Sequence, residues 1–153
     1  MKLYLLSLAL GLGQSPPTKS VIVLPGYFSC QGSLLTPNQN AAFTCYAPTQ
    51  RGCQKGAVIL AYETRVSSPT GKGSFTIADT IRLTLRYPNN NLSISSCAAG
   101  TGPPRQYFVL CKDDALGKKY LRNVLRIWGV NAQGKLVELP VKTLRCLNDD
   151  FGA

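Results

Sequence analysis

Apolar and polar side chains alternate strictly over Ile81–Tyr87. Apolar residues occupy every second position of this segment, and Arg82 and Arg86 lie between them. A period of two places successive side chains on opposite faces of a β-strand. The segment therefore predicts a strand with one buried face and one face that presents both arginines to solvent.

Six further segments have the apolar and β-branched content of strands, and residues typical of turns separate them. They are Val21–Leu24, Ala57–Val66, Leu92–Ser95, Tyr107–Cys111, a segment that begins at about Leu121, and Leu136–Val141. We expect Leu92–Ser95 to pair with Ile81–Tyr87 through a turn, and 131–134 to form a hairpin loop. Pro140 should confine the last strand to an edge or a bulge.

The segment from Lys118 to Val130 fits two structures. Its apolar residues share one face of a helix, but they also alternate with Arg122 and Arg126 as in a strand. We favour a strand from about Leu121, with one short helix near Lys118–Val124 as the alternative. Seven short strands at hairpin spacing predict an all-β or mainly β fold, a small disulfide-stapled antiparallel sandwich or barrel.

The first 13 residues have the layout of a secretory signal peptide. Lys2 precedes an almost wholly apolar run from Leu3 to Leu12. The small residues Gly11 and Gly13 fit a cleavage site before Gln14, with cleavage after Gly11 as the alternative. The run is too short for a transmembrane helix, which needs roughly 20 apolar residues. We therefore expect residues 1–13 to be a signal peptide, 14–24 an N-terminal segment and 25–153 a single β domain, in a protein that is secreted.

All six cysteines follow the expected cleavage point. An even number in an exported chain predicts three disulfides. Short loops favour the pairs Cys45–Cys53 and Cys97–Cys111, and Cys30–Cys146 would then join the two ends of the domain. The chain has no histidine and no Cys-x-x-Cys pair, so the usual zinc spacings are absent, and we expect neither a metal nor a cofactor.

The chain is basic, with 17 Lys and Arg against 7 Asp and Glu and a net charge of +10, which becomes +9 without residues 1–13. This charge favours acidic partners, although no DNA-specific motif is present. Arginines on strand faces could hold phosphate, sulfate or uronate oxygens, and aromatic rings could stack on sugars. The candidate binding residues are Arg82, Arg86, Arg122, Arg126, Tyr107 and Trp128. The alternative is that the aromatic residues are core and the arginines a solvated sheet face.

The absence of histidine excludes Ser-His-Asp and Cys-His catalysis. Paired carboxylates are the remaining enzyme chemistry, and Glu63 and Glu138 lie in strand-like segments that could meet across a sheet. A membrane-active toxin is disfavoured, since no cationic amphipathic helix is evident. Asn91-Leu92-Ser93 is an N-glycosylation acceptor in an expected turn, so Asn91 would carry a glycan in a eukaryotic source.

The signal-like start, the six cysteines and the β-rich middle together resemble the small secreted cysteine-rich proteins of filamentous fungi, many of which are host-directed effectors. The resemblance implies a virulence effector that recognises a host or extracellular protein. We therefore predict a secreted non-enzymatic binding protein, whose partner is such a protein or an anionic polysaccharide. The alternative is a histidine-free hydrolase of acidic polysaccharide.

Overall fold

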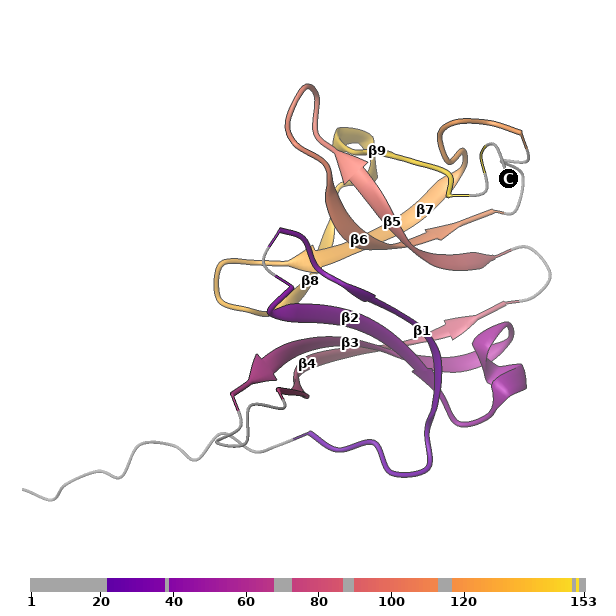
Figure 1. The fold of residues 1–153 in the computed structure, drawn as a ribbon. Coiled ribbons are helices and arrows are strands. Elements are labelled where there is room, and N and C mark those ends of the chain that lie inside the picture. Colours follow the sequence, from indigo (N-terminus) through magenta and orange to yellow (C-terminus); the bar gives the residue numbers. More distant parts are fainter. Residues whose placement is uncertain are drawn as a thin grey trace, which may run out of the picture.

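In the computed structural model, the described residues are 22–37, 39–67, 73–86, 90–112, 117–149 and 151. They form two antiparallel sheets that lie face to face, the first below the second in Figure 1. The first sheet has the order β1–β2–β3–β4, with β1 at Phe28–Leu34, β2 at Ala41–Ala47, β3 at Gly56–Val66 and β4 at Ser74–Leu85.

The second sheet has the order β8–β7–β6–β5–β9. Its strands are β5 at Asn91–Ala98, β6 at Arg105–Cys111, β7 at Val124–Val130, β8 at Leu136–Leu139 and β9 at Arg145–Cys146. Two short 3₁₀ helices complete the described part, η1 at Gln50–Cys53 and η2 at Val141–Thr143. No strand ladder joins the two sheets in this part of the chain, so the fold is a sandwich and not a closed barrel.

An apolar layer between the sheets is the main core. The Phe43 ring from β2 contacts the Phe108 ring from β6 at a centroid distance of 4.5 Å. Trp128 on β7 is 1% exposed and lies in the same cluster. Burial of large apolar side chains is the dominant favourable term in folding. The other buried members come from both sheets: Cys45, Ala47, Val58, Leu60, Leu85, Leu92, Leu110 and Leu136.

A second, smaller core lies on the outer face of the second sheet. Val109 and Ile127 point away from the first sheet, because their neighbours Phe108 and Trp128 point toward it. Val141 is the first residue of η2, and Leu144 lies between η2 and β9. Both side chains pack against this outer face. The C-terminal part of the chain therefore covers the second sheet.

Polar side chains link the two sheets at one open edge of the sandwich. The Gln31 Nε2 on β1 donates a hydrogen bond of 3.0 Å to the Leu92 carbonyl on β5. The Gln106 Nε2 on β6 donates to the Ser33 hydroxyl at 2.6 Å, and its Oε1 accepts from the Thr36 backbone N–H at 3.1 Å. These bonds join layers between which the described residues form no backbone ladder.

The opposite edge is closed by Asp79 on β4. One of its carboxylate oxygens accepts a hydrogen bond of 2.8 Å from the Leu136 backbone N–H at the start of β8. The other lies 3.2 Å from the Lys135 ammonium. A single carboxylate thus holds the edges of the two sheets together.

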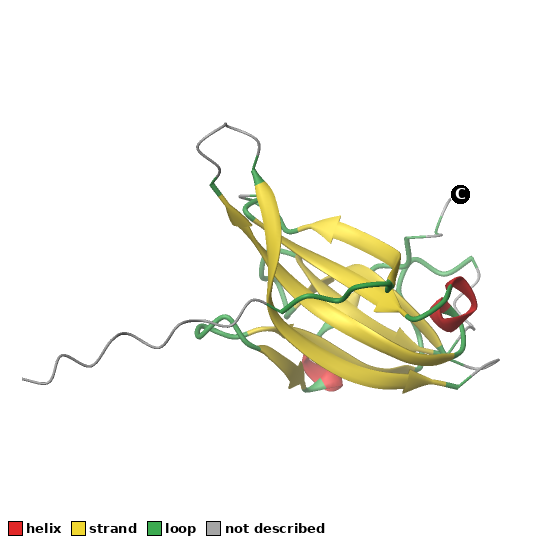
Figure 2. Cartoon of the chain, turned by 90° about the horizontal axis from the view of Figure 1, so that it is seen from below, coloured by secondary structure: helices red, strands yellow, loops and turns green. Residues whose placement is uncertain are grey.

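Residues before β1 cover part of the outer face of the first sheet. The stretch 22–27 runs across its strands (Figure 2), and Ile22 forms an isolated antiparallel bridge with Ile77 on β4. The strand predicted at Val21–Leu24 is therefore reduced to one bridge in its described part. The signal peptide expected at 1–13 lies outside the described residues.

Other strand predictions are confirmed or corrected by the register. Ala57–Val66, Tyr107–Cys111 and Leu136–Val141 correspond to β3, β6 and β8, and β8 is an edge strand that Pro140 follows. The pairing of Leu92–Ser95 with Ile81–Tyr87 is wrong, because the chain crosses to the other sheet between β4 and β5. No helix forms over 118–124, since strand β7 begins at Val124 and the residues before it are irregular.

The interlayer core makes a stability prediction. Phe108→Ala removes a ring that is 0% exposed, and we expect the free energy of unfolding to fall by roughly 3–5 kcal/mol. Leu125→Ala, at a side chain that is 39% exposed on the next strand, should cost about 1 kcal/mol or less. Urea denaturation of both variants measures the difference. Equal losses would contradict the assignment of Phe108 to the core.

Candidate functional site

The structure disperses the predicted arginine patch. Arg82 is exposed on the outer face of the first sheet, opposite Ile59 of β3. Arg126 lies on β7 of the second sheet and is already paired with a carboxylate. Arg86 and Arg122 are both exposed and lie at one end of the sandwich, just after β4 and just before β7. Of the four arginines, Arg86 and Arg122 are thus the two that the fold places at the same end.

Both predicted stacking aromatics belong to the two cores. Trp128 is buried in the interlayer cluster, so its ring is closed to ligands. Tyr107 is half-buried on the outer face of the second sheet and lies over Gly129 of β7. A Cβ at Gly129 would lie 2.8 Å from the ring, so the glycine makes room for it. The core interpretation is correct for Trp128, whereas Tyr107 packs against the second core with part of its surface exposed.

Arg126 forms a closed group with its neighbours on the inner face of β7 and β8. Its Nε and Nη2 donate hydrogen bonds to the two carboxylate oxygens of Glu138 at 2.9 and 2.6 Å. The guanidinium lies 4.7 Å from the centroid of the Trp128 ring. The hydrogen bond from Arg126 holds the pKa of Glu138 below its usual range. Both charges are satisfied within the chain.

Glu63 is engaged elsewhere, on the outer face of the first sheet. It is 8% exposed, and the Tyr46 hydroxyl donates a 2.5 Å hydrogen bond to its carboxylate. Glu138 lies in the other sheet and pairs with Arg126. The structure therefore does not bring Glu63 and Glu138 together as a catalytic pair.

The disulfides differ from the pairing expected from loop length. Cys30 on β1 is bonded to Cys53 at the end of η1. Cys97 on β5 is bonded to Cys146 on β9, the residue directly opposite it in the ladder. All three expected pairs are thus wrong. Cys45, which was expected in a disulfide, is a free thiol in the interlayer core.

The glycosylation and metal predictions have separate outcomes. Asn91 is exposed, but it is the first residue of β5 and not part of a turn. Its glycosylation stays a prediction. No group of three or more potential metal ligands occurs among the described residues, and none of their helices is long and apolar enough to cross a membrane.

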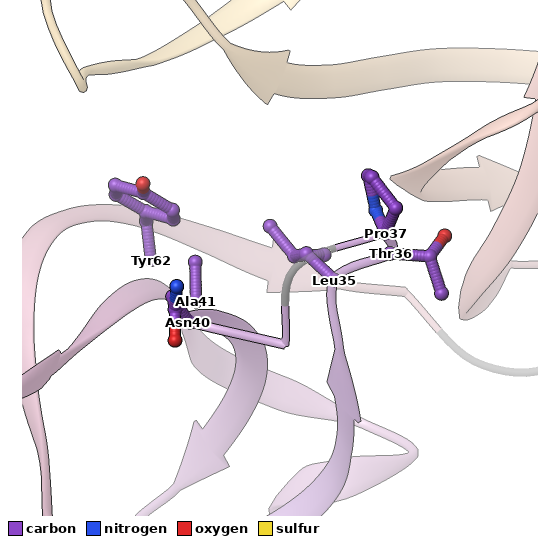
Figure 3. Close-up of a pocket in the computed structure, with 6 residues that line it drawn as sticks. All are labelled: Leu35, Thr36, Pro37, Asn40, Ala41 and Tyr62. Atoms are coloured by element: carbon purple, nitrogen blue, oxygen red, sulfur yellow. The ribbon is translucent and has the colours of Figure 1, made fainter.

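A hollow of about 250 Å³ lies at the β1–β2 loop. In Figure 3 the Tyr62 ring lies on one side of it, and the loop residues Leu35, Thr36 and Pro37 lie on the other. Asn40 and Ala41 complete the described lining. None of these side chains is charged, so the hollow does not account for the basic character of the chain.

A second hollow, of about 170 Å³, lies beside β9. The Arg145 guanidinium lies 4.3 Å from the centroid of the Tyr120 ring, and the Lys119 ammonium lies 5.7 Å from the same centroid. No described residue of the lining is acidic, and the salt bridges among the described residues do not involve Arg145. The described lining consists of Ser96, Ala98, Gly100, Pro104, Tyr120, Arg145 and Leu147.

Sequence reasoning missed Tyr120 and Arg145. They lie in short irregular or two-residue elements, with no alternation around them. The one sequence feature next to Arg145 that indicates a fixed position is Cys146, because its disulfide holds this short strand in place.

Basic side chains also gather at the end of the sandwich where β4 ends and β7 begins. Lys55 precedes Gly56, which pairs with Leu85 at the end of β4, so Lys55 and Arg86 lie close in the ladder. On the second sheet, the backbone N–H of Lys112 bonds to the Asn123 carbonyl, next to Arg122. With Arg51 on η1 these exposed residues form what we call the basic end: Arg51, Lys55, Arg86, Lys112 and Arg122.

A comparison of the chain with protein families, curated proteins and solved structures finds no match. The resemblance to secreted fungal proteins therefore stays a prediction.

The burial of Cys45 predicts an inert thiol. Desolvation raises its pKa from 9.0 to about 11, so very little reactive thiolate exists at neutral pH. Iodoacetamide should leave Cys45 unmodified in the native protein and alkylate it in denaturant, as peptide mass spectrometry would detect. Rapid alkylation of the native chain would contradict its place in the core.

The Tyr46–Glu63 pair predicts a loss of stability at alkaline pH. Burial, followed by the hydrogen bond to Glu63, raises the pKa of Tyr46 from 10.0 to about 12. The folded chain binds this proton more tightly than the unfolded chain, so its contribution to stability is complete below pH 10.0 and is lost as the pH rises through about 12.

Tyr46→Phe should therefore show a shallower fall of the unfolding free energy over this pH interval than the native chain. Urea denaturation at a series of alkaline pH values measures it, with Tyr27→Phe as the control tyrosine. Parallel curves for Tyr46→Phe and the native chain would show that the pair does not hold the proton.

Proposed function

We propose that the protein is a secreted, non-enzymatic binding protein whose basic end binds an anionic polysaccharide. The observation that carries the proposal is the basic end itself. Five exposed cations lie there, on η1 and next to strand ends of both sheets, and none takes part in the salt bridges found among the described residues.

The distribution of acidic groups supports this proposal. Three of the described carboxylates have partners inside the chain: Glu63 with Tyr46, Asp79 with Lys135, and Glu138 with Arg126. They are therefore not available to neutralise the basic end. Asp113 and Asp114 follow Lys112 in the sequence and lie outside the described residues.

A polymer suits this surface better than a small ligand. The cations are carried by residues next to strand ends and by one turn of 3₁₀ helix, so they are spread over the end of the sandwich and not gathered in a hollow. A polyanion can contact several such charges at once, and its affinity then depends strongly on salt.

Secretion is part of the proposal and rests on two features. The layout of residues 1–13 is that of a signal peptide, and the two described disulfides are typical of oxidising compartments. The host-directed effector role stays a prediction from the resemblance.

The proposal is tested with two double charge reversals of equal size. Arg86→Glu with Arg122→Glu changes the basic end, whereas Arg82→Glu with Lys142→Glu changes exposed cations outside it. Binding to polygalacturonate and to heparin is measured by calorimetry over a range of salt. We expect the first variant to bind at least roughly tenfold more weakly and the second to lose much less.

Equal losses in the two variants would show that only the net charge matters and that the basic end is not the site. Absence of binding by the native protein at low salt would overturn the proposed function. Circular dichroism of both variants checks that the sheets are retained, since all four positions are exposed.

A further inference from the structure

We propose that the hollow beside β9 is a separate binding site for one oxyanion carried on a sugar ring, such as a carboxylate or a sulfate. The site would bind a single sugar unit, whereas the basic end requires a polymer. It therefore goes beyond the proposed function and does not depend on it.

The first step of the argument is charge. Arg145 and Lys119 place two positive charges over one Tyr120 ring, at 4.3 and 5.7 Å from its centroid. No described acidic side chain lines the hollow, and Arg145 is the charged residue of its described lining. An anion that enters the hollow would pair with this positive charge.

The second step is the contact of the Arg145 guanidinium with the Tyr120 ring. The N–H groups of a guanidinium lie in the plane of its fork, so a ring against its face leaves them free to donate. These donors match the two oxygens of a carboxylate or sulfate. Because Arg145 lines the hollow, the donors are available to a group that enters it.

The third step is rigidity, because a rigid site loses little entropy when it binds a ligand. β9 is tied to β5 by the Cys97–Cys146 disulfide, and Ala98 pairs with Arg145 in the same ladder. The Leu147 N–H donates to the Ser96 carbonyl at 2.8 Å. The chain is thus fixed at Arg145 and at the two residues that follow it.

The segment that carries Tyr120 is fixed by the same strand. Tyr120 forms a bridge with Leu147, and the Leu121 N–H donates to the Cys146 carbonyl at 3.0 Å. The Asn148 N–H and side-chain amide donate to the carbonyls of Lys119 and Lys118. The ring and the guanidinium are therefore positioned before any ligand binds.

The fourth step is the shape and polarity of the lining. Ser96 and Ala98 lie on the same face of β5 as Leu92 and Ile94, which pack in the interlayer core. The hollow is thus on the inner face of the second sheet, where β9 extends that sheet past β5. Pro104, Leu147 and Ala98 offer apolar contact to the C–H face of a sugar, and Ser96 can hydrogen-bond to a hydroxyl.

The test uses monosaccharides, so that polymer binding at the basic end cannot contribute. Galacturonate, galactose 6-sulfate and neutral galactose are titrated into the isotope-labelled protein, and NMR shifts of residues 96–100 and 145–147 are followed. We expect the two anionic sugars to bind at the hollow and the neutral sugar to bind at least about tenfold more weakly. The two anionic arms distinguish a carboxylate ligand from a sulfate ligand.

Arg145→Gln should weaken the binding of the anionic sugars by about tenfold, and Arg145→Lys should recover only part of it, because the fork is lost while the charge is kept. Lys142→Gln is the matched control, since it removes one exposed charge outside the lining. Arg145 is exposed, so its replacement should leave the fold intact, which the amide spectrum verifies.

Three results would overturn the site. They are equal binding of neutral and anionic sugars, no binding of either anionic sugar at millimolar concentration, and equal losses in Arg145→Gln and Lys142→Gln. Loss of polymer binding in the double variant of the basic end, with monosaccharide binding retained, would show that the two sites are independent. Polymer binding that depends on the basic end, together with no monosaccharide binding at the hollow, would reject the hollow and leave the proposed function standing.

Discussion

The apolar layer between the two sheets determines which face of every strand is left for other contacts. Phe43 and Phe108 meet in this layer, and side chains alternate along each strand. In the first sheet the alternation turns Glu63 and Arg82 outward. In the second sheet it turns Val109 and Ile127 outward, where they form the second core. The outer surfaces of the sandwich therefore follow from its interior.

The second core in turn positions the hollow. Val109 and Ile127 are apolar, so their burial by Val141 and Leu144 stabilises the C-terminal part of the chain against the second sheet. Cys146 enters this core beside Cys97, and the disulfide joins them. Since successive residues of a strand point to opposite faces, Arg145 must then point away from the core. One constraint buries the cysteine and exposes the arginine.

The sequence predicted the fold class because several strands are half-buried and alternate visibly. It missed β1 and β2 for different reasons. β1 contains Gly32 and an irregularity at Cys30, which break the period of two. β2 is rich in alanine and buried on both faces, so its polar positions are too few to show a pattern.

The crossing from β4 to β5 was also beyond local reasoning. The residues between them have the composition of a hairpin turn, and a turn signal does not say whether the chain returns to the same sheet. For the same reason, short loops were a poor guide to the disulfides. Cys97 and Cys146 are separated by 49 residues but are direct neighbours in the ladder.

The candidate site was predicted only in part. Arg86 and Arg122 were identified from strand patterns, and the structure places them at the same end. On sequence grounds Trp128 and Tyr107 could be core or surface. The structure packs Trp128 into the core between the sheets and Tyr107 against the second core. Tyr120 and Arg145 meet only through the pairing of 120 with 147, which is a long-range contact without a local pattern.

The two basic regions differ in how firmly the backbone holds them, and this difference separates their ligands. Arg86 and Arg122 lie just beyond strand ends, outside the ladders of β4 and β7. Loosely held cations lose side-chain freedom when they bind, a cost that many simultaneous contacts to a polymer can offset. Arg145 and Tyr120 lie between backbone bonds and a disulfide. Because that ordering is already complete in the folded chain, a single charged group can be enough to bind there.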